Sequence, residues 1–220
     1  MQLRRFNFFD LNLDSDKGVV DTLLKDAQLN VATSGHGNFI LCDSEGNIHI
    51  LNKNFKATTF RGYAITTTLA EYVKHSPFLV TVGEDEVGVN PLLKVWNTEK
   101  LDKNGNPSCV RVTRLSPGHK AVQPSCICIH EGINLLSVGF QDGSILLFRG
   151  DLTRDRSSKP KLLKDSGASM ITGLAFRTSA KYCFLFVTST DHVFFYDVST
   201  KDKEIKVFEF ETFNLKNLRS

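Results

Sequence analysis

The stretch VGFQDGSILLFRG, from Val138 to Gly150, consists of an apolar run, a polar corner and a second apolar run. Gly143 in the corner supplies the positive φ angle that a tight hairpin requires. We therefore expect strands over Leu135–Phe140 and Ile145–Phe148. Three looser copies of this order occur in the chain: FILCDSEGNIHIL from Phe39, VGEDEVGVNPLLKVWN from Val82 and LFVTSTDHVFFYDV from Leu185. The sequence thus predicts four similar hairpins.

The spacing of the hairpin corners indicates the repeat. Acidic residues at the four corners, Glu45, Asp85, Asp142 and Asp191, are separated by 40, 57 and 49 residues. Blades of WD40 and kelch propellers repeat at roughly 40–50 residues. The longest interval contains NTEKLDKNGNPSCVRV, which we interpret as an insertion with an exposed Asn-Gly-Asn-Pro turn. Between the hairpins, segments beginning at Gly62, Ser125 and Ile171 are expected to form the innermost strand of the next blade.

One physical reason explains the repetition. A small antiparallel sheet with two apolar faces cannot fold alone, whereas stacking such sheets face to face buries both sides. The sequences FLFV and VFFY, at Phe184 and Val193, lack the polar alternation of a sheet with one wetted face. We predict an all-β, WD40-like β-propeller of about four blades that forms an incomplete ring. The partial propeller is expected over residues 1–206, and residues 207–220 are expected to form a divergent tail or an outer strand.

Composition and charge exclude several classes. The 220 residues include 27 basic and 24 acidic ones, a net charge of +3 that is scattered and lacks the concentrated basic face of a nucleic-acid-binding protein. The group Lys159, Lys161 and Lys164 is interpreted as a solvated loop. Five widely spaced cysteines favour reduced thiols and the cytosol. The first residues do not read as a signal peptide, and no apolar run approaches the roughly 20 residues of a membrane span.

The acidic corner Glu84, Asp85 and Glu86 is the first candidate site. Paired carboxylates suit acid–base catalysis or calcium, but catalysis needs a pocket and a neighbour that shifts a pKa, and calcium needs a longer series of ligands. A solvated hairpin tip is the expected arrangement, with an electrostatic contact to a partner protein as the functional alternative.

The segment DLTRDRSSKPKLL is the second candidate, because a long, charged, proline-bearing stretch is typical of an exposed loop. Its possible partner-binding residues are Asp151, Arg154, Asp155, Arg156 and Lys159.

Other motifs favour structural roles. Cys126, Cys128 and His130 share one face of a strand, but ligands one residue apart diverge from a tetrahedral centre, so buried cysteines between blades are expected. Trp96 is expected to pack between blades. No nucleophile elbow or phosphate-binding glycine loop is found. We therefore expect no enzyme activity, no cofactor, no metal and no small-molecule substrate.

Three segments, RRFNFFD, GEDEVGVNPLLKVWN and GDLTRDRSSK, closely resemble the N-terminal propeller of the vacuolar protein sorting-associated protein 11 family. The resemblance covers roughly Arg4 to Lys206. It implies a core subunit shared by the HOPS and CORVET tethering complexes, in which an α-solenoid and a zinc-binding RING domain follow the propeller. This sequence lacks both, and without a Cys-x-x-Cys pair no zinc site is carried over.

The resemblance implies a non-catalytic interaction module of an endosomal and lysosomal (or vacuolar) membrane-tethering complex acting in vesicle docking, fusion and protein transport. Its partners would be the other tethering subunits, and it would be cytoplasmic and held on late endosomal and lysosomal membranes through them. The alternative is a truncated orphan propeller scaffold without a stable complex, arising from a truncated product, an alternative transcript or a partial gene model. Uncovered apolar faces would then cause self-association.

Overall fold

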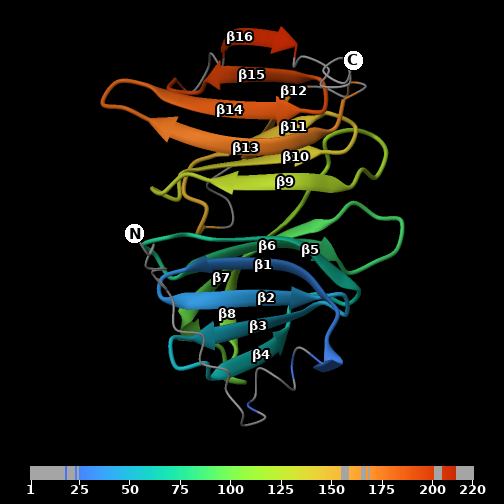
Figure 1. The fold of residues 1–220 in the computed structure, drawn as a ribbon, viewed down its shortest axis with the longest axis vertical. Coiled ribbons are helices and arrows are strands. Elements are labelled where there is room, and N and C mark those ends of the chain that lie inside the picture. Colours follow the sequence, from blue (N-terminus) through green and yellow to red (C-terminus); the bar gives the residue numbers. More distant parts are fainter. Residues whose placement is uncertain are drawn as a thin grey trace, which may run out of the picture.

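A computed structural model of the chain consists of four antiparallel sheets of four strands each (Figure 1). It describes residues 25–154, 159–164, 167, 169–200 and 205–211, together with residues 18 and 23. The first sheet contains β1 (Leu29–Gly35), β2 (Asn38–Asp43), β3 (Asn47–Asn52) and β4 (Ala57–Arg61), and the second contains β5 (Thr66–Tyr72), β6 (Phe78–Glu84), β7 (Leu92–Leu101) and β8 (Pro107–Arg114). The third contains β9 (Pro124–Ile129), β10 (Leu135–Phe140), β11 (Ile145–Arg149) and β12 (Lys159–Lys164), and the fourth contains β13 (Ile171–Thr178), β14 (Cys183–Ser189), β15 (His192–Asp197) and β16 (Ile205–Glu211).

The sheets form the blades of a four-bladed β-propeller, as the sequence predicts. Strands follow chain order within every sheet, from an innermost first strand to an outermost fourth strand. The inner strands β1, β5, β9 and β13 lie toward the middle of the molecule, whereas β4 and β16 lie at its two ends (Figure 1). The expected inner strands beginning near Gly62, Ser125 and Ile171 are confirmed as β5, β9 and β13.

The predicted hairpin of the third sheet is also confirmed. β10 has the expected bounds, and β11 is one residue longer than expected. Gly143 and Gly46 occupy matching corners of the third and first sheets with φ angles of 83° and 84°. A Cβ at Gly143 would lie 2.6 Å from the carbonyl oxygen of Ser169, so both the conformation and the space require glycine there.

The expected insertion after Asn97 is wrong. The segment forms the end of β7 and most of β8, which pair along the outer half of the second sheet. Only its turn is a loop, where Asp102 Oδ1 accepts hydrogen bonds from the backbone N–H groups of Asn104 and Asn106 at 2.8 and 2.9 Å. The long interval between corners therefore reflects a long hairpin and a wide corner within one blade.

The expected solvated loop at Lys159, Lys161 and Lys164 is wrong as well. These residues belong to β12, the outermost strand of the third sheet, which pairs with β11. Pro160 within this segment suggested a loop, but proline is tolerated in an edge strand because one side of that strand forms no sheet hydrogen bonds. Edge position, which the local sequence does not reveal, explains the error.

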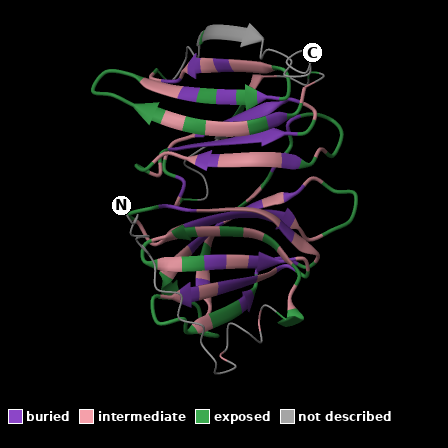
Figure 2. Ribbon diagram, in the orientation of Figure 1, coloured by how far each residue is buried: buried purple, intermediate pink, exposed green. Residues whose placement is uncertain are grey.

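The sheets are held together by three apolar clusters at the junctions between consecutive blades. The third sheet shows this most clearly, because all six residues of β10 are buried (Figure 2). Leu136, Val138 and Phe140 point into the junction with the second sheet, beside Val80 and Leu93. On the other face of the third sheet, Leu135, Ile145 and Leu147 pack against Leu185, Val187 and Phe194 of the fourth sheet.

The fourth sheet has a second face that none of these clusters covers. Phe184 and Phe195 of this face are half-buried, and Phe186 is 40% exposed. Their rings contact one another, with centroids 5.8 Å apart for Phe184 and Phe195 and 5.1 Å for Phe186 and Phe195. Among the described residues, the clusters thus join the blades in a row from the first to the fourth.

The N-terminal segment RRFNFF, Arg4–Phe9, which carries part of the family resemblance, lies outside the described residues. The domain boundary expected after residue 206 falls within β16. In the part of the chain that the structure describes, no helix is long and apolar enough to cross a bilayer.

The shared junctions lead to a stability prediction. Phe140→Ala removes a fully buried ring from the junction between the second and third sheets and is expected to lower the free energy of unfolding by about 3–5 kcal/mol. Phe39→Ala, at a side chain that is 55% exposed, is the matched control and should change it by less than about 1 kcal/mol. Urea unfolding followed by circular dichroism measures both, and equal losses would contradict the assignment of the junction as core.

Candidate functional site

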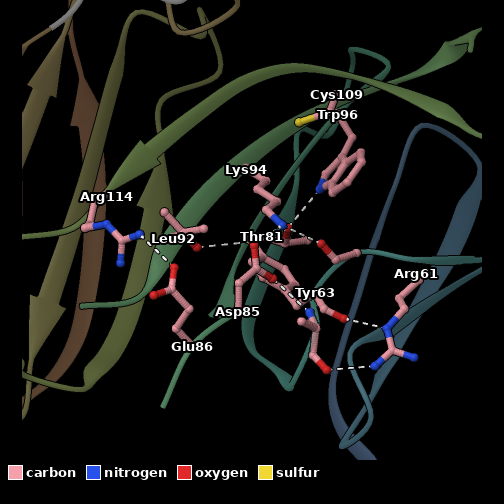
Figure 3. A network of polar contacts seen from close by, with 12 residues as sticks. Arg61, Tyr63, Thr81, Asp85, Glu86, Leu92, Lys94, Trp96, Cys109 and Arg114 are labelled. Atoms are coloured by element: carbon pink, nitrogen blue, oxygen red, sulfur yellow. Dashed lines mark hydrogen bonds and ion pairs between the residues drawn. The ribbon is translucent and has the colours of Figure 1, made fainter. Parts of the chain in front are cut away.

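The acidic corner between β6 and β7 is tied into the fold rather than freely solvated. Asp85 Oδ2 lies 2.8 Å from Lys94 Nζ, and its Oδ1 accepts a hydrogen bond of 2.8 Å from the backbone N–H of Ala64 (Figure 3). Ala64 belongs to the connection that leads from the first sheet into β5. Asp85 thus fixes this connection to the corner, and the interpretation of Asp85 as part of a solvated hairpin tip is wrong.

Lys94 and Tyr63 complete the contact between the first two blades. Lys94 Nζ donates to the carbonyl oxygen of Gly62 at 2.7 Å and lies 4.3 Å from the centre of the Tyr63 ring. The buried Tyr63 hydroxyl lies 2.9 Å from Thr81 Oγ1 and donates to the Leu92 carbonyl oxygen at 3.2 Å. These bonds cross from the connection to β6 and β7, so they hold the second sheet to the chain that precedes it (Figure 3).

Trp96 packs between blades, as the sequence predicts. Its ring contacts Phe60 of the first sheet edge-on, with ring centroids 5.0 Å apart. Its indole N–H donates to Thr81 Oγ1 at 2.9 Å, so the one polar atom of the ring is satisfied inside the junction.

Glu84 and Glu86 flank Asp85 but have different surroundings. Glu84 Oε1 accepts a hydrogen bond of 2.6 Å from Gln123, which precedes β9, and so joins the second sheet to the third. Glu86 lies 3.6 Å from Arg114 with 65% of its side chain exposed. Of the three acidic residues, Glu86 is therefore the one that faces solvent most openly.

Ionisation of Asp85 is coupled to these contacts. Burial is the largest single influence on its pKa and raises it, but the hydrogen bonds from Lys94 and Ala64 and the positive charge of Lys94 together outweigh burial. The pKa of Asp85 is consequently below its ordinary value of 3.8. The carboxylate is charged at neutral pH and its charge stabilises the fold.

The second candidate segment lies between β11 and β12. Asp151 Oδ1 accepts hydrogen bonds from the N–H and hydroxyl of Thr153 at 2.9 and 2.6 Å, and Arg154 forms an ion pair with Asp151 at 3.1 Å. Asp155 and Arg156 lie outside the described residues, and Lys159 begins β12. The expected loop is thus shorter than predicted and ends at the edge strand.

The two candidate segments are at opposite ends of the sheets. Each sheet has three turns, because its four antiparallel strands follow one another in chain order. The middle turn lies at one end of the sheet, and the first and third turns lie at the other end. We call these the corner end and the far end. Gly62 N–H donates to the Gly46 carbonyl oxygen at 2.9 Å, so the connections between blades also reach the corner end. Glu84 to Glu86 are at the corner end, whereas Asp151 and Arg154 are at the far end.

The cysteines of β9 are packed as expected. Cys128 is buried in the junction between the third and fourth sheets, with Cys126 against the same cluster. Burial, followed by the negative charge of Glu71, raises the pKa of Cys128 well above its ordinary value of 9.0. Within the described ranges, no group of three or more His, Cys, Asp or Glu side chains is arranged to hold a metal ion.

Several residues of these networks were not identified from the sequence. Tyr63 and Lys94 are among them, as is the buried pair Asp43 and His49, whose Oδ2 and Nε2 atoms are 3.2 Å apart. His49 Nδ1 also lies 2.9 Å from Thr59 Oγ1. The sequence does show a polar residue just before or within each corner, which could have indicated these contacts. The partner side chain of that residue comes from another strand, however, and the local sequence does not identify it.

These features define a WD40-like β-propeller module whose blades are joined by apolar junctions and polar clamps. The model of the family described as PEP5/VPS11 N-terminal matches residues 4–215. The chain therefore belongs to the PEP5/VPS11 family, and its residues correspond to the N-terminal part of that family.

Curated relatives agree with this assignment. The vacuolar protein sorting-associated protein 11 homolog of Homo sapiens is 39% identical over 218 residues, which cover 92% of this chain and 23% of the relative. The homolog of Mus musculus is 43% identical over 174 residues, covering 79% of this chain and 18% of the relative. The homolog of Dictyostelium discoideum is 34% identical and covers 91% of this chain and 22% of the relative. The chain thus spans about a fifth of the length of the curated relatives it matches.

Solved structures resemble the fold at low sequence identity. Saccharomyces cerevisiae Sqt1 is 14% identical with a TM-score of 0.59, and the match covers 84% of this chain and 47% of Sqt1. The computationally designed Ika4 protein is 16% identical with a TM-score of 0.51, covering 75% of this chain and 87% of Ika4.

The contacts of Asp85 with Ala64 and Lys94, which we call the Asp85 clamp, lead to a prediction. Asp85→Ala removes the acceptor of the Ala64 N–H and the carboxylate partner of Lys94, and it is expected to lower the free energy of unfolding by about 2 kcal/mol at pH 7. Glu86→Ala, the neighbouring control, should change it by less than about 0.5 kcal/mol, because exposed ion pairs contribute little. Urea titrations of the three proteins test this.

The difference in unfolding free energy between the original chain and Asp85→Ala should depend on pH in a defined direction. A carboxyl whose folded-state pKa is depressed stabilises above its unfolded pKa, and this stabilisation is lost as pH falls through the folded-state pKa. The gap between the original chain and Asp85→Ala should therefore narrow below the ordinary value of 3.8. A gap that stays constant through that acid range would show that the Asp85 charge does not stabilise the clamp.

Proposed function

We propose that the chain is a non-catalytic interaction module of a membrane-tethering complex of the endosomal and lysosomal, or vacuolar, system. The observation that carries the proposal is the match of residues 4–215 to the PEP5/VPS11 N-terminal family. The curated relatives are named for vacuolar protein sorting. By the resemblance of its motifs, the complex is HOPS or CORVET, and the process is vesicle docking and fusion in intracellular protein transport.

A structural role is consistent with how the acidic residues are used. Asp85 and Glu84 each bind a group of a neighbouring connection, so these carboxylates are engaged in holding the blades together. A general acid or base has to reach a substrate, and side chains committed to fold contacts are poorly placed for that. The family match also favours a complex subunit over an orphan scaffold.

The propeller would act as a rigid body with separate contact surfaces at its two ends. At the corner end, Glu86 and its neighbour Arg114 are exposed on the rim, and Glu84 and Asp85 hold this corner in place. At the far end, Asp151 and Arg154 lie in the loop after β11 and Lys159 begins β12, while Asp155 and Arg156, which follow Arg154 in the sequence, are outside the described residues. Because the two surfaces face opposite ways, one module can contact two subunits at once. The partners are other tethering subunits, through which the module is held peripherally on late endosomal or lysosomal membranes.

Affinity capture tests the proposal. A tag placed on the gene product that contains this chain should co-purify the other subunits of a HOPS- or CORVET-type complex, identified by mass spectrometry. Capture of none of these subunits would contradict the proposed function.

Charge reversals then locate the surfaces. Glu86→Lys at the corner end and Arg154→Glu at the far end should each reduce the recovery of different subunits by about fivefold, since rim charges contribute on the order of 1 kcal/mol. Glu45→Lys and Lys103→Glu are exposed controls at the same two ends and should leave recovery unchanged. If a variant and its control reduce subunit recovery equally, the surface that the variant alters is not a specific contact surface.

A further inference from the structure

A pocket of about 620 Å³ opens at the far end, where the inner strands of three blades end. Its size falls within the roughly 300–1,000 Å³ range of ligand pockets. The polar or charged residues on its walls are Glu71 at the end of β5, Cys128 in β9, His130 and Glu131 just after β9, and Arg177 and Thr178 at the end of β13.

Glu71 is a half-buried carboxylate that has no cationic partner among the described residues. Its Oε1 accepts a hydrogen bond from the backbone N–H of Ile129, whose nitrogen is 3.4 Å away. Among the described residues, no ion pair and no hydrogen bond from another side chain involves the Glu71 carboxylate. A partly desolvated carboxylate without a charged partner is unfavourable, because burial penalises the ionised form.

The titratable groups near Glu71 do not neutralise the charge of its carboxylate. His130 is committed elsewhere, with its Nδ1 3.0 Å from Asn134 Oδ1 and its Nε2 2.7 Å from Thr178 Oγ1. Glu131 adds a second acid, and the thiol of Cys128 is buried. Arg177 lines the pocket from the fourth sheet and forms no ion pair with Glu71.

The pKa of Glu71 reflects this isolation. Burial raises it from an ordinary value of 4.5 to about 7, and the N–H of Ile129 opposes burial only weakly. The pocket therefore contains a carboxyl group whose pKa lies close to neutral pH.

We propose that this pocket receives a lysine or arginine side chain of an extended segment of a partner protein, with Glu71 as the anion that binds its charge. The inference rests on the proposed function as an interaction module and names the chemistry of one contact. Ile127, Leu174 and Phe176 on the walls suit the aliphatic stem of such a side chain, while its charged head reaches Glu71.

A second hollow provides a path for the remainder of the segment. A pocket of about 400 Å³ between the third and fourth sheets shares His130 and Thr178 with the first and continues toward Arg149 and Ser199. The two pockets are thus neighbours at the far end, with the hydrogen-bonded pair His130 and Thr178 between them.

Binding of a cation at Glu71 should be linked to pH. A positive charge favours the ionised carboxylate, so binding below pH 7 releases a proton and becomes weaker as pH falls. Between pH 8 and pH 5.5, retention of basic peptides is expected to fall by about tenfold.

A peptide pool tests the proposal directly on the 220-residue chain. The probe is a set of random heptapeptides whose fixed central residue is lysine, arginine, glutamine or norleucine, passed over the immobilised chain. At pH 8, peptides with central lysine or arginine should be retained about tenfold over those with norleucine. Glu71→Gln should abolish this preference and its pH dependence, whereas the matched control Glu45→Gln, at an exposed acid of the corner end that does not line the pocket, should retain both.

Thermal unfolding supplies a readout that does not depend on the peptides. A carboxyl whose folded-state pKa is raised destabilises the fold as pH rises from its unfolded value of 4.5 through about 7. Glu71→Gln should therefore have a higher Tm than the original chain at pH 8 and the same Tm at pH 4.5. Retention by Glu71→Gln equal to that of the original chain, or no preference for basic peptides with either protein, would overturn the proposal. Either result would leave the capture of tethering subunits unaffected, so the two proposals fail separately.

Discussion

The structure depends on one constraint: a thin sheet with two apolar faces is stable only when both faces are covered. The third sheet satisfies it most fully, because Val138 and Phe140 pack toward the second sheet while Ile145 and Leu147 pack toward the fourth. The second and third blades therefore each contribute to two cores, and the loss of one blade exposes its neighbour. The repetition in the sequence follows from this requirement.

Polar clamps determine how the blades are oriented once the apolar faces have met. Apolar packing is non-directional, whereas the contacts of Asp85 with Ala64 and Lys94 have defined geometry. Asp85, for which the sequence favours a solvated hairpin tip with a partner contact as the alternative, thus helps to hold the propeller together at the corner end. Glu86 and the loop at Asp151 are exposed at opposite ends of the sheets, and Glu71 lies in the pocket at the far end.

Much of the fold was predictable, because it depends on local patterns. Gly143, the apolar runs and the spacing of the corners indicated the hairpins and the propeller, and the bounds of β10 agree with the prediction. The errors at the β7–β8 hairpin and at β12 concern outer strands, whose polar, proline-bearing sequences resemble loops. The clamps and the pocket at Glu71 were beyond prediction because their members are brought together only by blade stacking. Tyr63 and Lys94, for example, are 31 residues apart yet in contact.

Native-state hydrogen exchange along the 220-residue chain tests most directly whether the blades stabilise one another. If they do, the amides of β6 in the second sheet and β10 in the third should exchange with the same opening free energy, and Phe140→Ala should lower both by the same amount. If instead β10 loses protection while β6 keeps it, each sheet is stable on its own, and the account of mutually dependent blades is contradicted.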